Sequence, residues 1–350
     1  MVQSFCKSFR KFFLTTFFPF MLMGFEPKIV TPYPVLGFKE HIFFDPHQKV
    51  ERRLLMWYPV VPGTMGKPSN NAWDLFSVAP NVPLDPSQAN QRLIVLSHGY
   101  MGSPQNQSWL IRELVHQGFM VAAMPHRDLM DGLFHLNHWQ RAQDVTTLLD
   151  QFADLPLAKN SNLHKVGIAG FSLGGTTAMW VAGGKTTRLD SLVPGPEYAA
   201  PRDYTRTNEA LPTLNKEMMS KDWRDKRVQA AFVMAPGWSW LFEPASLQQI
   251  SIPVYLIAAE ADQTLVTKNN AGLFARHIPK AYFQTISGKA GHFIFISALS
   301  TAHRQAVDPK GQLQFLFEDD SSVDRSWIQS QISEEAVRFF KSTLLDNPCD

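Results

Sequence analysis

The chain has few of the residue patterns that accompany metal or redox chemistry. It has only two cysteines, Cys6 and Cys349, which lie near opposite ends of the 350 residues. Cysteines this far apart provide neither a disulfide framework nor the paired spacing of a zinc site. The sequence also has no H-E-x-x-H segment, which excludes a zinc hydrolase of that type. We therefore expect no metal and no cofactor.

Signals for phosphate or nucleic-acid binding are also missing. Gly184-Lys185-Thr186 is similar to the end of a phosphate-binding loop, but Met179 stands where this motif requires a glycine five positions earlier. The net charge is only +2, and lysines and arginines are scattered rather than gathered in a stripe. These features exclude nucleic acid as an expected partner. The sequence indicates no oligomeric state.

The longest apolar run is too short to span a bilayer comfortably. It covers residues 12–25 and follows a basic head at 7–11. This order is typical of a secretory signal, although no A-x-A cleavage site follows it. We expect export, to the periplasm or beyond the cell, with residues 1–32 either cleaved or retained as an anchor at a membrane surface. The alternative is an amphipathic arm or a mis-assigned start, and residues 33–350 are expected to form the folded domain.

The rest of the chain alternates short apolar strands with amphipathic helices. Two leading strands are expected at 39–45 and 52–59, followed by a loop rich in proline and asparagine at about 60–90. Further strands are expected at 93–97, 119–123, 165–169, 228–233, 254–258 and 282–286, and helices at 107–117, 138–153, 176–183 and 326–345. Fully apolar strands that alternate with helices are typical of parallel sheets. We predict an α/β fold, with a mostly parallel central sheet flanked by helices on both faces.

Residues 185–226 interrupt this alternation. The segment contains Pro194, Pro196, Pro201 and Pro212, together with mixed charges. It is the natural place for a small lid inserted into the domain. The alternative is a solvated excursion that takes no part in substrate binding.

Gly170-Phe171-Ser172-Leu173-Gly174 is the most informative stretch of the chain. This G-x-S-x-G pentapeptide lies between a predicted strand and a predicted helix. A serine at such a sharp turn presents its hydroxyl at the carboxyl edge of the sheet, and the flanking glycines are required because a Cβ would collide with the turn. We predict that Ser172 is a nucleophile. The alternative is an ordinary glycine-rich turn with a buried capping serine.

A nucleophilic serine needs a base and an acid that holds the base. Both should follow strand ends, in the chain order serine, acid, histidine. Asp262 follows the strand at 254–258 directly and is the preferred acid, with Glu260 as its competitor. His292 follows the last strand in a loop that contains glycine, and is the preferred base.

The other histidines are weaker candidates for the base. There are eleven histidines in the chain, so a histidine alone means little. His277 is expected on a helix surface, and His303 is a weaker alternative in the segment after His292. His126 and His135 could line the site without being the base.

Two backbone N–H groups should stabilise the oxyanion of the reaction. One belongs to Leu173, the residue after the nucleophile. The other is expected in Ser97-His98-Gly99-Tyr100-Met101-Gly102, after the strand at 93–97, where either Tyr100 or Met101 can donate. The alternative is that this loop is a plain turn.

Together these motifs resemble the α/β-hydrolase superfamily, over residues from about 35 to 345. Within it, the chain is similar to esterases of the dienelactone-hydrolase-like and platelet-activating-factor-acetylhydrolase-like groups. The likeness rests on Met56-Trp57-Tyr58-Pro59, Leu96-Ser97-His98-Gly99-Tyr100, Pro125-His126-Arg127-Asp128, Gly170-Phe171-Ser172-Leu173-Gly174-Gly175 and Gly291-His292-Phe293. It implies an α/β-hydrolase fold and a Ser172–Asp262–His292 triad.

The chain departs from both groups in one respect each. The acetylhydrolases place the aspartate after the strand that directly follows the nucleophile helix, and here Met234-Ala235-Pro236-Gly237-Trp238 stands there without a carboxylate. This favours Asp262 and the dienelactone-hydrolase-like arrangement. True dienelactone hydrolases use a cysteine nucleophile, and this chain has Ser172. Neither group's own substrate therefore follows.

The predicted function is hydrolysis of carboxylic esters through an acyl-enzyme on Ser172. Apolar side chains near the site, above all Trp238, Trp240 and Phe293, favour an acyl-chain or aromatic ester, including a lipid or phospholipid. These side chains could instead pack the lid against the core. The alternatives are a hydrolase-fold binding protein without activity, and a peptidase or thioesterase that uses the same machinery.

Overall fold

A mixed sheet of ten strands is the centre of this computed structural model, which describes residues 35–345 except for 131–132, 191 and 202–204. The strand order is β12-β11-β10-β9-β5-β6-β2-β1-β4-β3. The described residues group as one compact unit. The expected secretory or anchoring segment at 1–32 lies outside the described residues. Within the described ranges, no helix combines the length and the apolarity that a membrane crossing needs.

The central strands run parallel and are almost completely apolar. They are β5 (Leu93–Ser97), β6 (Met120–Ala123), β9 (Val166–Phe171), β10 (Val228–Met234), β11 (Val254–Ala259) and the edge strand β12 (Ala281–Ile286). Every residue of β5, β6, β9 and β11 is buried, because helices cover both faces. These strands confirm the predicted parallel sheet.

The first strands extend the sheet in mixed directions. β1 (Val35–Asp45) and β2 (Val50–Tyr58) form an antiparallel hairpin, and β2 runs antiparallel to β6. The predicted loop at 60–90 was wrong in part. It contains β4 (Ser77–Pro80), which pairs with β1, and the two-residue strand β3 (Lys67–Pro68). Strands this short have no detectable alternation of polar and apolar residues.

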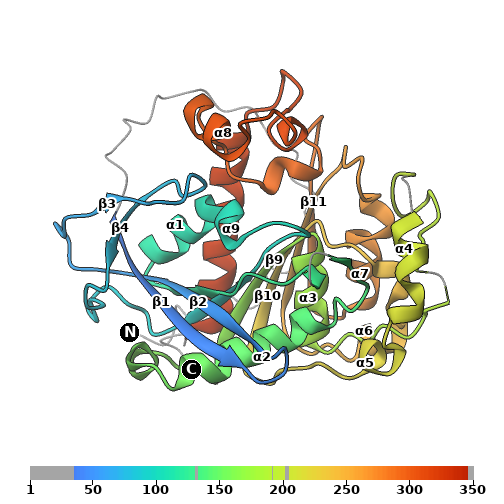
Figure 1. Cartoon of the computed structure of the whole chain (residues 1–350), viewed down its shortest axis with the longest axis horizontal. Helices are drawn as coiled ribbons and strands as arrows, with labels where there is room; N and C mark the ends of the chain where they lie inside the picture. Colours follow the sequence, from blue (N-terminus) through green and yellow to red (C-terminus); the bar gives the residue numbers. More distant parts are fainter. Residues whose placement is uncertain (1–34, 131–132, 191, 202–204, 346–350) are drawn as a thin grey trace, which may run out of the picture. The chain divides into compact units, whose positions relative to one another are not determined.

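Helices cover the sheet in two layers (Figure 1). One face packs against α1 (Ser108–His116) and α9 (Arg325–Leu344), and the other against α2 (Gln140–Ala153), α3 (Leu173–Ala182) and α7 (Ala271–His277). On α9 the residues Ile332, Ala336, Phe340 and Leu344 are buried at four-residue spacing. Burying a large apolar side chain stabilises the fold by about 1.5–3 kcal/mol, so this stripe fixes the helix on the sheet.

The insertion between α3 and β10 contains two short helices, α4 (Thr205–Ala210) and α5 (Lys216–Ser220). It is attached to the domain by aromatic packing, since the rings of Trp223 and Trp139 stack 5.3 Å apart. It is also tied to the loop after β11, because the Val266 N–H donates to the carbonyl oxygen of Tyr198. The remaining elements are short and lie in loops: β7 (Leu129–Met130), β8 (Leu133–Phe134), α6 (Pro244–Gln248) and α8 (Thr301–Val307).

Candidate active site

Ser172 lies at the turn between β9 and α3, with a strained backbone. Its φ of 54° and ψ of −117° are unfavourable for any residue with a side chain. A Cβ on Gly170 would lie 2.2 Å from the carbonyl oxygen of Gly174, so the turn can close only with glycine there. α3 begins at Leu173, three residues earlier than predicted, and so directly after the serine. Strain of this kind is typical of functional turns.

His292 lies beside this serine although 120 residues separate them. It follows β12 and begins the short 3-10 helix η7 (His292–Phe295). Its Nε2 atom is 3.0 Å from Ser172 Oγ, and the residue is 4% exposed. The serine hydroxyl can therefore transfer its proton directly to the imidazole.

Asp262 lies on the other side of the imidazole. Its Oδ2 atom is 2.6 Å from His292 Nδ1, and its Oδ1 atom accepts the N–H groups of Thr264 and Leu265, both at 2.8 Å. A carboxylate in this position keeps the Nδ1 proton in place and leaves Nε2 free to accept the serine proton. Glu260, the competing acid, is exposed, and among the described residues the hydrogen-bond partners of the imidazole are Asp262 and Ser172. The structure thus joins Ser172, His292 and Asp262 in one continuous series of hydrogen-bond contacts.

The other histidines lie elsewhere. His277 ends α7, and His303 is on α8, where its Nδ1 atom lies 2.8 Å from the Ser300 hydroxyl. Neither His126 nor His135 lines the cavity described below. His138 does, and the sequence did not indicate it. The sequence signal for His138 was weak, because the sequence places it at the start of a predicted amphipathic helix, and in the structure it lies just before α2.

The loop after β5 contains Tyr100 and Met101, the two candidates for the second oxyanion donor. Met101 is not available for that role, because its N–H donates to Asp128 Oδ2 at 2.7 Å. The prediction of Met101 is therefore wrong. Asp128 is 27 residues away, in a segment with neither a strand nor a helix pattern, so the sequence gave no sign of this contact. Tyr100 lines the cavity next to Ser172, as does Leu173. The Leu173 N–H belongs to the first turn of α3, where N–H groups have no intrahelical acceptor.

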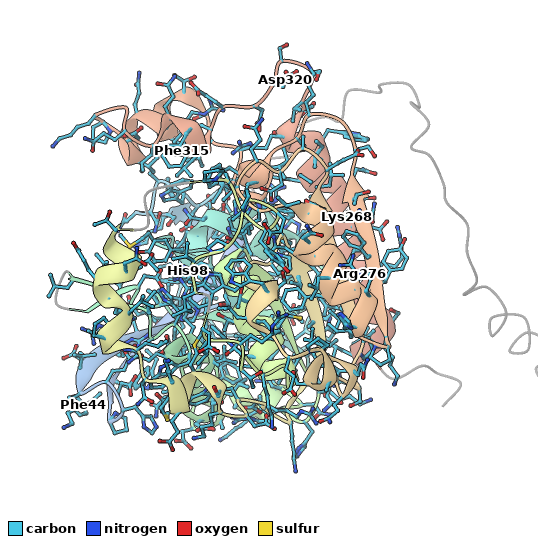
Figure 2. The ribbon with its side chains drawn as sticks, turned by 90° about the vertical axis from the view of Figure 1, so that its right-hand side faces the viewer. Phe44, His98, Lys268, Arg276, Phe315 and Asp320 are labelled. Atoms are coloured by element: carbon cyan, nitrogen blue, oxygen red, sulfur yellow. The ribbon has the colours of Figure 1, made fainter. Side chains whose placement is uncertain are left out.

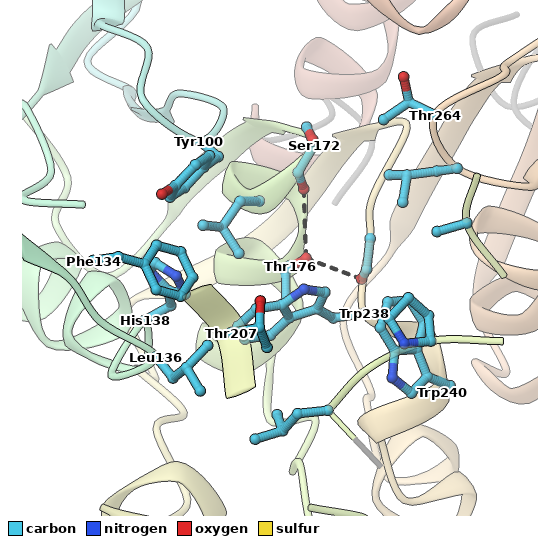
Figure 3. A pocket seen from close by; sticks show the side chains of 16 residues that line it. Tyr100, Phe134, Leu136, His138, Ser172, Thr176, Thr207, Trp238, Trp240 and Thr264 are labelled. Carbon is cyan, nitrogen blue, oxygen red and sulfur yellow. Dashed lines mark hydrogen bonds between the residues drawn. The ribbon is translucent and has the colours of Figure 1, made fainter. Parts of the chain in front are cut away.

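A cavity of about 310 Å³ opens beside Ser172 (Figure 3). Its lining is mostly apolar and comprises Tyr100, Phe134, Leu136, His138, Ser172, Leu173, Thr176, Leu192, Pro194, Ala199, Thr207, Gly237, Trp238, Trp240, Thr264 and Leu265. Trp238 and Trp240 therefore lie where the sequence places them. The insertion at 185–226 contributes part of the wall, through Leu192, Pro194, Ala199 and Thr207.

Phe293 does not line this cavity, which corrects the prediction. Its ring packs against Phe315, 5.3 Å away, and stands edge-on to His292 at 5.2 Å. Although Phe293 directly follows His292 in the sequence, its side chain points away from the cavity. The spacing of apolar residues in the sequence does not predict which way each side chain of a short 3-10 helix points.

Thr176 connects the serine turn to the tryptophan loop. Its hydroxyl donates to the carbonyl oxygen of Gly237 at 3.0 Å and lies 3.5 Å from that of Ser172 (Figure 3). Gly237 precedes Trp238, whose own backbone has a φ of 59°. Ser172 and one aromatic wall of the cavity are therefore held in a fixed relation.

A buried polar network lies behind the loop at 98–102. Asp144 pairs with Arg52 and lies 2.7 Å from His126 Nδ1, and His126 Nε2 lies 2.9 Å from the Ser97 hydroxyl. The neighbouring His98, labelled in Figure 2, is fully buried and accepts the backbone N–H of His126 at its Nε2 atom. Ser97, His126 and Asp144 thus repeat the residue types of the site, but Ser97 is 1% exposed and out of reach of a substrate.

Burial and charge determine the ionisation of this network. Burial acts to raise the pKa of the Asp144 carboxyl, but the hydrogen bond from His126 and the charge of Arg52 outweigh it and lower the pKa to about 2. Burial lowers the pKa of His98 and His126, and the positive charge of Arg141 adds to this effect. Burial also lowers the pKa of His138 to about 3, against the attraction of Asp128. The His138 ring in the cavity wall is therefore neutral near neutral pH.

No protein-family model matches this chain, and no curated protein matches its sequence. Solved structures do resemble it, among them a ferulic acid esterase from Streptomyces cinnamoneus with a TM-score of 0.58 and 17% sequence identity. That alignment covers 92% of this chain and 95% of the esterase. At this identity the likeness concerns the fold alone. The chain has the α/β-hydrolase fold, with a large, mostly parallel sheet flanked by helices.

Proposed function

We propose that this protein is a serine hydrolase of carboxylic esters. The observation that carries the proposal is the continuous contact from Ser172 Oγ through the imidazole of His292 to the carboxylate of Asp262, with separations of 3.0 Å and 2.6 Å. The strained turn at Ser172 and the adjoining apolar cavity support it. The fold is shared with a ferulic acid esterase, a protein named for ester hydrolysis.

The proposed reaction has two steps. In the first, Ser172 Oγ attacks the ester carbonyl carbon while its proton passes to His292 Nε2, and Asp262 stabilises the imidazolium that forms. The carbon–oxygen bond to the alcohol then breaks, and the alcohol leaves with the proton from His292. In the second step, His292 takes a proton from water, the resulting hydroxide attacks the acyl-enzyme, and the acid leaves as Ser172 regains its proton.

The negative charge that develops on the carbonyl oxygen needs backbone donors. Leu173 and Tyr100 are the proposed donors, since Met101 donates to Asp128. Removing one such donor typically lowers kcat by about 10²–10³-fold. Each oxyanion donor is therefore expected to make a large contribution to the rate, although a smaller one than the side chain of Asp262.

The cavity favours an ester with an apolar acyl or aromatic group. Aromatic and aliphatic side chains dominate its wall, and its polar groups are mainly hydroxyls and a neutral imidazole. The residues of this lining include no charged side chain to pair with a charged group, and they bury hydrocarbon well. Action on lipid or phospholipid esters, and attachment at a membrane surface by the apolar head, remain predictions within this proposal.

An activity-based probe tests the proposal. A fluorophosphonate should label the wild-type protein, and labelling should disappear in Ser172→Ala. A panel of p-nitrophenyl esters, thioesters and peptide amides then separates an esterase from a thioesterase or peptidase. Absence of labelling in the folded wild-type protein would instead identify a binding protein that shares the fold.

A further inference from the structure

The loop at 98–101 is held by one buried ion pair, between Arg141 and Asp128. Arg141, near the start of α2, donates from Nε to Asp128 Oδ1 at 2.8 Å and from Nη2 to Asp128 Oδ2 at 2.6 Å. The same guanidinium donates to the carbonyl oxygens of His98 at 2.6 Å and Gly99 at 3.2 Å. The side chains of both charged residues are nearly inaccessible, at 2% and 3% exposure.

Asp128 fixes the next peptide of the same loop. Its Oδ2 atom accepts the Met101 N–H at 2.7 Å while it also accepts from Arg141. The loop closes as a four-residue turn, because the Gly102 N–H donates to the carbonyl oxygen of Gly99. Met101 occupies the third position of this turn with a φ of 55°. Turns with a positive φ there favour glycine or asparagine, so a methionine needs an external contact to hold it.

We propose that Arg141 and Asp128 are positioning residues, which hold the loop so that the Tyr100 N–H faces the carbonyl oxygen of the ester. The inference rests on the proposed function of Ser172. The ion pair sets both ends of the Tyr100 residue: Arg141 fixes the carbonyl groups before it, and Asp128 fixes the N–H after it. The orientation of Tyr100 between two fixed peptide groups is then determined.

The geometry requires an arginine rather than any cation. Arg141 uses its planar fork to contact a carboxylate and two carbonyl oxygens at once. A lysine has one ammonium group on a flexible stem and cannot reproduce this arrangement, although it keeps the charge. Because oxyanion donors act only on the transition state, a displaced loop should lower kcat and leave substrate binding nearly unchanged.

Arg141→Lys is the first test, with p-nitrophenyl butyrate as substrate. We expect kcat to fall by about 10²-fold at a KM within about twofold of wild type. The inhibition constant of butylboronic acid, which forms a tetrahedral adduct with the serine, should rise in parallel. The control is Arg227→Lys, because Arg227 also binds a carboxylate in bidentate fashion, that of Asp225. Arg227 directly precedes β10 and so lies at the amino-terminal ends of the parallel strands, whereas Ser172 follows the carboxyl end of β9. The kcat of this control should stay near wild type.

Met101→Pro is the second test and leaves the ion pair intact. Proline removes the N–H that Asp128 accepts and cannot adopt a positive φ. Met101 is 57% exposed, so no core contact is lost. The missing hydrogen bond and the forced change of φ should lower the melting temperature by a few degrees, while kcat falls by a factor similar to that in Arg141→Lys. This variant decides the matter if Arg141→Lys does not fold.

The outcomes separate the two proposals. Loss of fluorophosphonate labelling and of all ester turnover in wild type overturns the proposed function itself. If the wild-type enzyme is active, the positioning role is overturned by either of two results. One is an unchanged kcat and boronate affinity in Met101→Pro. The other is an Arg141→Lys variant in which only the melting temperature falls. A selective fall of kcat and boronate affinity in the loop variants supports it.

Discussion

The α-carbon of Gly174 faces the carbonyl oxygen of Ser97 so closely that a Cβ would lie 1.9 Å from it. This contact brings the start of α3 against the end of β5, and so brings the serine turn against the loop with the proposed oxyanion donor. The second glycine of the G-x-S-x-G motif is therefore needed for the contact between two elements, and not only for the turn itself.

Gly174→Ala should be both unstable and inactive. The Cβ would meet backbone atoms of Ser97 and His98, which cannot move without displacing a central strand. We expect a loss of about 2–4 kcal/mol in the free energy of unfolding. Urea denaturation and ester turnover would measure both effects. In Gly272→Ala, the control on α7, the closest atom lies 3.4 Å from the new Cβ, and stability should be unchanged or increase by about 0.5–1 kcal/mol.

Asp262→Asn should abolish most activity without loss of the fold. The asparagine can still accept the N–H groups of Thr264 and Leu265, but its amide no longer holds the Nδ1 proton of His292. A fall in kcat of about 10⁴-fold is expected from comparable triads. Steady-state kinetics and a thermal melt on the same preparation would check this. Glu260→Gln, at an exposed position two residues earlier, should stay within about twofold of wild type; a large effect there would reopen the choice of acid.

The part of the cavity wall that the insertion contributes should bind the acyl chain of the substrate and so favour longer acyl groups. A hexanoyl group has four more methylenes than an acetyl group, and each buried methylene adds about 0.8 kcal/mol. If all four are buried, hexanoyl esters should be turned over with a kcat/KM about 200-fold above that of acetyl esters. Thr207 lies in this wall, and Thr207→Trp should remove the preference for hexanoyl esters while leaving acetyl esters nearly unaffected.

Asn208→Trp is the matched control for this comparison. Asn208 is the next residue of α4, and it is exposed and does not line the cavity. The chain-length profile should stay as in wild type. Equal or lower rates of wild type on longer chains, or an unchanged profile in Thr207→Trp, would show that the insertion and the cavity do not bind the acyl group.

Acid should destabilise the protein through its buried imidazoles. The folded-state pKa of His138 is about 3, below its ordinary value of 6.5, so between these values the unfolded chain binds a proton that the folded protein does not. This contribution to stability is fully present above pH 6.5 and is lost as the pH falls toward 3. Each pH unit in this window costs about 1.4 kcal/mol for one such group.

His138→Phe should reduce this dependence. Phenylalanine keeps the ring among Tyr100, Phe134 and Trp238 and removes the titrating group. It also removes the buried Nδ1 atom, which has no hydrogen-bond partner among the described residues. The decrease in unfolding free energy between pH 6.5 and 4.5 should be about 2–3 kcal/mol smaller than in wild type, as measured by urea denaturation at each pH. An unchanged slope would mean that His138 is not the group responsible.

Local sequence determined the central features of this protein. The strand–serine–helix turn is specified within the segment 165–183, because its glycines and apolar residues are adjacent in the chain. The placement of Asp262 and His292 near Ser172 also followed from the sequence, since the carboxyl ends of parallel strands meet at one edge. The catalytic roles of these residues remain predictions, whereas their proximity is a property of the structure.

Only the tertiary structure decided which groups around Ser172, Asp262 and His292 are already hydrogen-bonded to other residues. The sequence offered Tyr100 and Met101 as equal donors, and the bond from Met101 to Asp128 distinguishes them. It gave no sign of Arg141, because an arginine at the start of an amphipathic helix usually faces solvent. Hydrogen-bond partners and side-chain directions depend on the packing of loops that are distant in sequence, and no local periodicity encodes them.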